Sequence, residues 1–360
     1  MREMNLDLEY RPVLGTKTDY GIGIIGAGGI VNAAHLPAYR KAGFNVVGLT
    51  DKDVDKANRT ARDFEVPRVF PSVESLLADP AVEIVDIAVP PWHQKELVRK
   101  ATEAGKHLLC QKPLSNVYAE AVEIVEMAEE GGVKLAVNQQ MRWDQAVRAS
   151  RTLLNRGLLG EPASAVIDVS ILTEWRAWPW VLEAGGLDLM FHSIHYFDSM
   201  RSLFGDPERV WSSGASYPGH VATGETRTIT VFEYSDTFRA LVSVNHNNWT
   251  EENFATLRID GTEGYAAGTF GLLYDYPHGR PDTLAWSSRK IDAGNTIKHR
   301  FEERWIPDSF IGPMGELMSS IEQDRLPETN GRDNLKTLQL VNAGYRSMAE
   351  HRAVAPSEIG

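Results

Sequence analysis

The chain has 360 residues, a length that suggests two or three domains. It carries 37 basic and 49 acidic residues, a formal net charge of −12, so we expect no nucleic-acid partner. Its one cysteine, Cys110, permits no intrachain disulfide. Because no apolar run approaches the roughly 18 residues of a membrane helix and the N-terminus lacks a secretory signal pattern, we expect a cytoplasmic protein without a membrane partner.

The first part of the chain alternates short apolar runs with amphipathic stretches. We expect an N-terminal arm over residues 1–18 and then strands at 20–25, 45–50, 84–89, 107–110 and 133–137. Helical patterns fill the intervals, notably over 94–104 and 117–130. This alternation predicts an α/β fold whose N-terminal Rossmann domain, over residues 19–140, is a doubly wound parallel sheet.

The pattern changes after about residue 140. Strand-like runs at 163–172, 226–235, 238–246 and 254–260 include three in succession without an intervening helix. Helical patterns return at 309–324 and 332–350. We therefore expect a C-terminal α+β domain over residues 141–360 with an open, largely antiparallel sheet, and a last helix that packs back toward the first domain.

A glycine-rich turn follows the first predicted strand. Gly26 can make the tight turn, and Gly28, followed by Gly29 and Ile30, lets the backbone approach a pyrophosphate at the start of a helix. Asp51 ends the next strand, where an acid accepts hydrogen bonds from the adenosine ribose; the alternative is that it caps the following helix. The acid favours NAD by repelling a 2′-phosphate, although the neighbouring Lys52 keeps NADP possible.

Four segments together resemble the glucose–fructose oxidoreductase and inositol dehydrogenase family, often called Gfo/Idh/MocA. They are GAGGIVNAAHLPAY (26–39), PPWHQKELVRKATEAGKHLLCQKPL (90–114), GGLDLMFHSIHYFDSMRSLFGDP (185–207) and GRDNLKTLQLVNAGYRSM (331–348). The resemblance implies NAD(P)-dependent oxidation or reduction of sugars, polyols or related compounds. It also implies a homo-oligomer formed through the C-terminal sheet.

The resemblance places candidate catalytic residues in two motifs. The family's Glu-Lys-Pro motif is Gln111-Lys112-Pro113 here, so the lysine is present and the glutamate is not. The second motif aligns His195 with the family's histidine and puts Phe191 at its aspartate position. The matching positions are Gly185, Gly186, His195, Asp198 and Gly205. A shifted alignment instead pairs Asp188 with His192, and His192 therefore remains a rival.

Oxidation of a secondary alcohol sends a hydride to nicotinamide and the hydroxyl proton to a base. We assign His195 as the proton acceptor and Lys112 as the group that stabilises the developing alkoxide. Asp188, His192 and His195 would share one helix face, so Asp188 could orient either histidine. The trio also has metal-ligand chemistry, and a further alternative is that one histidine is only packed in the core, but we assign the trio to the substrate and expect no metal.

Further candidates come from turns and aromatic residues. The resemblance places the turn of Pro90 and His93 near the nicotinamide ribose, unless His93 only caps a helix, and we also expect Gln111 and Lys112 to contact the cofactor. Trp175 and Arg176 begin an aromatic segment suited to a sugar ring, a subunit interface or lid packing. The resemblance puts Arg142 and Trp143 in the substrate cleft, with hinge packing as the alternative.

These observations favour an NAD-dependent dehydrogenase that acts on a carbohydrate-like alcohol. Two alternatives remain. One is an enzyme that cleaves glycosides through a transient internal redox cycle on NAD. The other is a non-catalytic NAD-binding sensor, which the replacements at Gln111 and Phe191 keep open.

Overall fold

The computed structural model describes residues 6–182, 184, 186–219, 221–250, 252–276, 278–291 and 294–360. Gly185 of the glycine pair lies outside these residues. The described chain forms two compact units. The parallel-sheet unit comprises residues 12–140 and 306–339, and the mixed-sheet unit comprises residues up to 11, 141–305 and 340–359. Among the described residues, no helix has the length and apolarity needed to cross a membrane.

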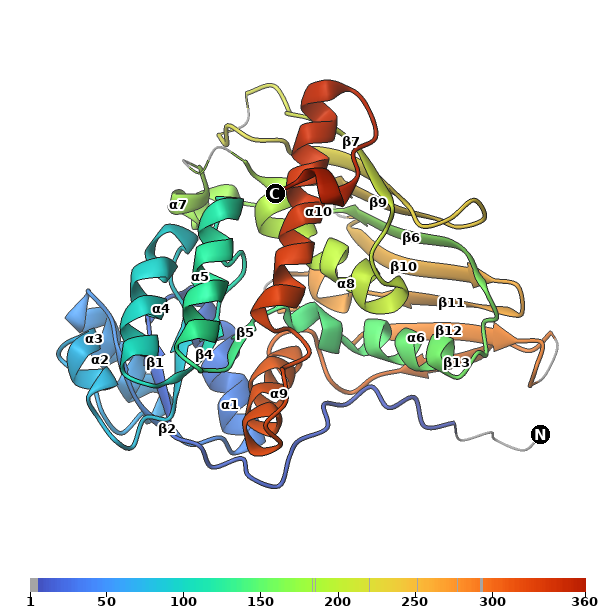
Figure 1. Ribbon diagram of the computed structural model, residues 1–360. Coiled ribbons are helices and arrows are strands. Elements are labelled where there is room, and N and C mark those ends of the chain that lie inside the picture. The colour runs from blue at the N-terminus through green and yellow to red at the C-terminus, as the bar shows by residue number, and fades with distance from the viewer. Residues whose placement is uncertain are drawn as a thin grey trace. The chain divides into compact units, whose positions relative to one another are not determined.

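The parallel-sheet unit has five strands in the order β2-β1-β3-β4-β5 (Figure 1). They are β1 (Ile22–Ile25), β2 (Val46–Thr50), β3 (Ile84–Ile87), β4 (His107–Cys110) and β5 (Leu135–Val137), paired in parallel throughout. The chain leaves β1 for β2 on one side and continues to β3 on the other. This reversal makes the carboxyl edge of β1 and β3 the switch point at which such sheets bind ligands.

Helices of this unit follow the strands that they connect. They are η1 (Val31–His35), α1 (Leu36–Ala42), α2 (Val54–Phe64), α3 (Val73–Leu77), η2 (Pro91–His93), α4 (Gln94–Glu103), α5 (Tyr118–Glu130), η7 (Asp308–Phe310) and α9 (Ile311–Glu322). The α/β class and the Rossmann topology predicted from the sequence are confirmed. The helix after the glycine-rich turn begins as a π-helix, η1, which the sequence pattern does not reveal.

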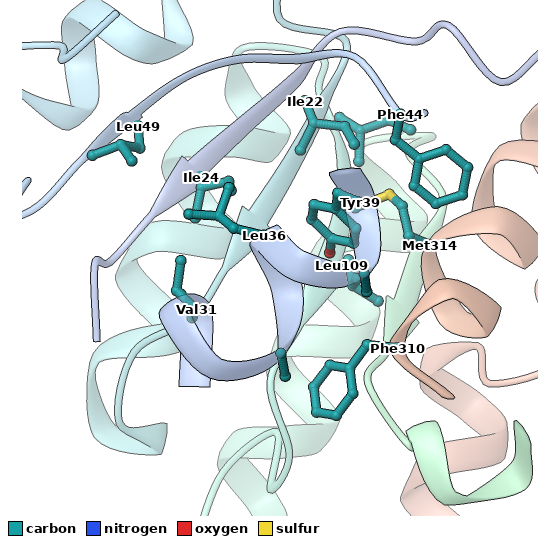
Figure 2. Packing of buried hydrophobic residues seen from close by; sticks show 14 of the residues in the cluster. Ile22, Ile24, Val31, Leu36, Tyr39, Phe44, Leu49, Leu109, Phe310 and Met314 are labelled. Carbon is teal, nitrogen blue, oxygen red and sulfur yellow. The ribbon is translucent and has the colours of Figure 1, made fainter. Parts of the chain in front are cut away.

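One face of the parallel sheet packs on α1 and α9. Ile22 and Ile24 are two residues apart on β1 and therefore point to this same face. Figure 2 shows them with Tyr39 of α1, and with Phe310 and Met314 from the returning C-terminal segment. All five are buried, so residues 306–339 supply part of the core of this unit.

The mixed-sheet unit has eight strands in the order β13-β12-β11-β10-β6-β9-β8-β7 (Figure 1). Their bounds are β6 (Pro162–Ser170), β7 (Arg209–Ala215), β8 (Arg227–Glu233), β9 (Arg239–Asn245), β10 (Phe254–Gly261), β11 (Gly264–Thr269), β12 (Thr283–Ser288) and β13 (Ile297–Arg300). Only the β6–β9 pair is parallel among these neighbours, so the predicted open, largely antiparallel sheet is confirmed.

The mixed-sheet unit also contains helices, of which α6 (Gln145–Asn155) and α8 (Ile194–Phe204) pack on one face of the sheet. The others are α7 (Pro179–Leu182), η5 (Leu189–Ser193) and the second half of α10 (Gly331–Glu350); short 3-10 turns are η3 (Gln140–Trp143), η4 (Trp175–Ala177), η6 (Gly271–Tyr274) and η8 (Pro356–Glu358). α6 packs against α8 and β11, and α8 packs against β9. On the other face, Ile229 of β8 and Trp211 of β7 are 48% and 38% exposed.

Candidate active site

The glycine-rich turn has the geometry of a phosphate cradle. Gly26 has φ of +108°, and a Cβ there would lie 2.4 Å from the carbonyl oxygen of Ala88, so only glycine fits. A Cβ on Gly28 or Gly29 would meet nothing within 4 Å, which leaves their backbone open to a ligand. The Asn32 side-chain amide donates to the Gly28 carbonyl oxygen at 2.8 Å and holds the turn in shape.

Asp51 lies at the end of β2, as the dinucleotide pattern requires. Its Oδ2 accepts a hydrogen bond from the backbone N–H of Ala27 at 2.7 Å, which ties it to the glycine-rich turn. The cap of α2 is Asp53 and not Asp51, because the Asp53 side chain accepts a hydrogen bond from the backbone N–H of Lys56 at the start of α2. Because an ionised carboxylate has about four acceptor sites, Asp51 retains capacity for ribose hydroxyls.

Lys112 lies two residues after the end of β4, on a loop that is held by hydrogen bonds from a buried amide side chain. The Gln94 side chain donates to the carbonyl oxygens of Gln111 and Pro113, each at 2.9 Å, and so clamps the backbone on both sides of the lysine. The Lys112–Pro113 peptide bond is cis. Burial lowers the pKa of the Lys112 ammonium to about 7. The side chain can therefore exist as a neutral amine near neutral pH.

Pro90 and His93 lie beyond the carboxyl end of β3. The Pro90 carbonyl oxygen accepts from the backbone N–H of His93 at 3.0 Å and closes the η2 turn. The His93 side chain is exposed and makes no capping hydrogen bond to α4. The His93 side chain therefore does not act as a helix cap for α4.

Three polar side chains meet in the mixed-sheet unit: Asp188, His192 and His246. Their candidate ligand atoms all lie within 4.8 Å of one another. Asp188 Oδ1 lies 2.7 Å from His246 Nε2 and 3.4 Å from His192 Nδ1. Asp188 and His246 are fully buried, whereas the His192 side chain is 17% exposed. We call this group the Asp–His–His triad.

Further hydrogen bonds fix the Asp–His–His triad. Ser193 and Thr228 hydroxyls donate to Asp188 Oδ2 at 2.7 and 2.5 Å. The Thr173 hydroxyl lies 2.8 Å from His246 Nδ1. Burial alone would raise the pKa of Asp188, but hydrogen bonds from His192 and His246 outweigh it and hold that pKa below its usual value. The carboxylate is therefore ionised at neutral pH, with donors on both oxygens.

Glu225 anchors the segment that carries Asp188. Its Oε1 accepts from the backbone N–H of Leu189 at 3.0 Å and from the Tyr345 hydroxyl at 2.8 Å. The first of these bonds uses the Leu189 N–H, which at the start of η5 has no partner within the helix. The helix start is thereby fixed, and Asp188 can turn its own carboxylate toward the histidines.

His246 is the site residue that the sequence analysis missed. It follows β9 and continues the alternation that buries Ala240, Val242 and Val244, so its side chain points to the helix-covered face. Since β6 and β9 are parallel, Thr173 and His246 lie beyond the same edge of the sheet. The predicted strand over 238–246 already ended on His246, and its period-two pattern puts this residue on the same face as Val244.

The predicted helical trio of Asp188, His192 and His195 needs correction. The Asp–His–His triad has His246 in the place that we gave to His195. The His195 ring packs edge-on against Trp305, with centroids 5.7 Å apart, and only 6% of the residue is exposed. The first turns over 189–193 are π-helical, so ordinary α-helical spacing does not describe this face.

Two residues assigned to the substrate have structural partners instead. Arg142 Nε and Nη2 lie 2.6 and 2.7 Å from the two oxygens of Asp198, and both side chains are almost completely buried. This bidentate pair joins η3 to α8. Trp143 is 2% exposed, and its ring packs under the Arg148 guanidinium. Both residues therefore make packing contacts, and their contact with the substrate stays a prediction.

The aromatic segment divides between core and surface. The Trp175 ring is buried and packs against His246 of the Asp–His–His triad, with the two ring centroids 4.8 Å apart. Arg176 is exposed, and its backbone N–H donates to Glu174. Trp178 is partly exposed and packs against Tyr276 at 6.1 Å. These rings offer apolar surface next to the polar groups.

The Asp–His–His triad has the residue types of a divalent metal site. Ligand atoms around a tetrahedral metal at about 2.1 Å lie roughly 3.4 Å apart. The 2.7 Å between Asp188 Oδ1 and His246 Nε2 is instead a direct hydrogen bond. The described geometry is that of a hydrogen-bonded network, and the absence of a metal remains our prediction.

Comparison with known proteins agrees with this geometry. Residues 20–139 match a family model described as "Oxidoreductase family, NAD-binding Rossmann fold". Residues 147–267 match the GFO/IDH/MocA C-terminal domain. The fold and site therefore define an oxidoreductase with an NAD-binding Rossmann domain. The chain belongs to the Gfo/Idh/MocA family.

Relatives cover most of the chain. It is 28% identical over 342 residues to a D-apiose dehydrogenase of Paraburkholderia graminis, covering 91% of this chain and 87% of that protein. It is 30% identical over 256 residues to the trans-1,2-dihydrobenzene-1,2-diol dehydrogenase of Mus musculus, covering 68% and 73%. The fold matches a levoglucosan dehydrogenase in complex with NADH and levoglucosan with a TM-score of 0.80, 20% identity, and coverage of 94% and 99%.

Proposed function

We propose that the protein is an NAD-dependent dehydrogenase that oxidises a secondary alcohol of a sugar, glycoside or polyol. The observation that carries this proposal is Lys112, a lysine with a pKa lowered to about 7. It lies at the carboxyl end of β4, in the same sheet whose β1 leads into the Gly26 turn. Parallel sheets of this type bind their ligands along that edge.

The NAD nicotinamide, when bound, accepts the hydride. Lys112 accepts the hydroxyl proton, because its lowered pKa allows the unprotonated amine near neutral pH. This changes the role expected from the sequence, in which Lys112 only stabilised charge. His192, oriented by Asp188, binds a substrate hydroxyl; it replaces His195 because its side chain is the partly exposed one of the Asp–His–His triad.

Sugars are the favoured substrate class for two reasons. Relatives over nearly the whole chain include a D-apiose dehydrogenase, and the fold matches a levoglucosan dehydrogenase. In addition, the aromatic faces of Trp178 and Tyr276 can pack on the apolar faces of a sugar ring. NAD is favoured over NADP because Asp51 would repel a 2′-phosphate. The partly exposed sheet face with Ile229 and Trp211 supports a homo-oligomer formed through this sheet.

Replacing Lys112 with methionine tests the proposal. Lys112→Met removes the proton acceptor but keeps much of the side-chain volume, so turnover should fall by about 10² to 10⁴ while NAD affinity stays near the wild-type value. Lys95→Met is the matched control, because Lys95 is a surface lysine paired with Glu123. Near-wild-type turnover in Lys112→Met would refute the assigned role.

A further inference from the structure

A buried polar chain leads to the Lys112 loop from within the parallel-sheet unit. It runs from Asp86 on β3 through His35 at the end of η1 to Gln111 after β4. Asp86 and His35 are completely buried, and Gln111 is 9% exposed. Buried polar groups of this kind are costly unless each finds a partner, so their hydrogen-bond directions can be worked out.

The Asp86 end fixes one proton. Asp86 Oδ2 lies 2.6 Å from His35 Nδ1 and 2.8 Å from the Tyr39 hydroxyl. Burial, and then the charge of Asp86, raise the pKa of Tyr39, so the phenol keeps its proton and donates. An ionised carboxylate only accepts. His35 therefore carries a hydrogen on Nδ1.

The Gln111 end fixes the other nitrogen. Gln111 Oε1 accepts the backbone N–H of Lys112 at 3.3 Å, so its amide nitrogen is the atom that faces His35 Nε2, at 2.5 Å. The Asn138 amide nitrogen approaches the same atom at 3.3 Å. Amide nitrogens donate, and His35 Nε2 must therefore accept. His35 is then a neutral imidazole with its hydrogen on Nδ1.

The surroundings of His35 leave little room for another arrangement. The His35 ring is surrounded by the side chains of Asp86, Tyr39, Gln111, Asn138 and Phe310. The Cys110 thiol lies near Asp86. Tyr39 and Phe310 belong to the apolar cluster of Figure 2. A glutamate at position 111 would require a second proton on His35, and thus a buried imidazolium between two carboxylates.

We propose that Asp86 and His35 are positioning residues, which orient Gln111 and thereby the backbone of the reacting Lys112. The amide at position 111 matches the neutral histidine, since it can donate to His35 while it accepts from Lys112. Gln94 completes the arrangement by binding the carbonyl oxygens on both sides of Lys112. This inference rests on the proposed catalytic role of Lys112.

Nitrogen NMR of the full chain with ¹⁵N-labelled histidine tests the proton positions without any substrate. In the wild type, the His35 signal, assigned by its change in Gln111→Met, should show a protonated Nδ1 and an unprotonated Nε2. In Gln111→Glu the same residue should become doubly protonated. An Nε2–H tautomer in the wild type, or unchanged His35 shifts in Gln111→Glu, would overturn the inference.

Kinetics test the positioning role. Gln111→Met should lower kcat about tenfold or more while KM for NAD stays within about twofold, because misplaced reacting groups slow chemistry rather than cofactor binding. Gln323→Met, an exposed glutamine, is the control. Unchanged kcat in Gln111→Met overturns the positioning role. If the wild type oxidises no sugar, the proposed function fails, whereas the NMR result still decides the proton arrangement.

Discussion

Replacing Asp188 with asparagine tests the Asp–His–His triad most sharply. Its two oxygens accept from Ser193, Thr228, His246 and His192, at 2.7, 2.5, 2.7 and 3.4 Å. In Asp188→Asn the amide nitrogen can turn to the hydroxyls, which are able to accept, while the oxygen keeps the histidines. What is lost is the charge in two bonds to histidine.

The magnitude follows from the two kinds of hydrogen bond. Bonds to a charged group contribute about 1.5–3 kcal/mol and neutral ones about 0.5–1.5, so two bonds that lose their charge cost about 2–3 kcal/mol. The lowered pKa of Asp188 shows that these bonds outweigh the cost of burying the carboxylate. We also expect kcat/KM to fall about 10- to 100-fold, because His192 loses its orienting partner.

Urea unfolding and initial rates measure both effects. Since the folded-state pKa of Asp188 lies below its unfolded value, its contribution is fully present above about pH 4 and is lost as the pH falls toward the folded pKa. The stability difference between wild type and Asp188→Asn should therefore narrow below about pH 4. Ser193→Ala, which removes one hydroxyl donor to this carboxylate, should cost about 1.5–3 kcal/mol. An Asp188→Asn variant with wild-type stability and rate at pH 7 would refute the reasoning.

Further predictions concern other groups. The kcat/KM of the wild type should rise with pH through an apparent pKa near 7, and Gln111→Glu should move this rise to higher pH by adding a negative charge next to Lys112; an unmoved profile contradicts the assignment. Burial raises the pKa of Asp282 to about 6, and burial and then the charge of Asp282 raise the pKa of the neighbouring Asp144, so the two carboxyls favour the folded state below about pH 4 and destabilise it as the pH rises through 6. Denaturation from pH 4 to 7 should show this decline in the wild type and a smaller one in Asp282→Asn, because Asp144 stays buried but loses its charged neighbour. Dialysis against EDTA should leave turnover unchanged, and loss of turnover restored by Zn²⁺ or Mn²⁺ would instead make the Asp–His–His triad a metal site. Ile229→Arg should reduce the sedimentation coefficient if the outer sheet face joins subunits, whereas an unchanged value places the interface elsewhere.

The sequence predicted the parallel sheet well because local signals and packing agree there. Val46–Thr50 and Ile84–Ile87 are short, mainly apolar runs that are almost completely buried, with Asp86 as the one charged residue, and each is followed by a turn and a helix. The mixed sheet was predicted less completely. Strand β11 reads Gly-Tyr-Ala-Ala-Gly-Thr, and its small residues give almost no alternation. Its place is set by pairing with β10 and β12, which no local pattern records.

In the candidate site, too, the features set by local sequence were predictable and those set by long-range contacts were not. Gly26 was predictable, because a strand followed by a tight turn needs a residue that tolerates positive φ. The partnership of Asp188 with His246 was not, because the two are 58 positions apart and meet only through the sheet. Arg142 was assigned to the substrate from the family resemblance, and only the structure reveals its buried pairing with Asp198.

One measurement tests the central claim directly. The purified protein, supplied with NAD and a panel of sugars, glycosides and polyols, is followed at 340 nm, and Lys112→Met is assayed in parallel. We expect NADH to form with at least one sugar or polyol in the wild type, and almost none in Lys112→Met, although both bind NAD. No NADH with any compound, or equal rates in both proteins, would contradict the account.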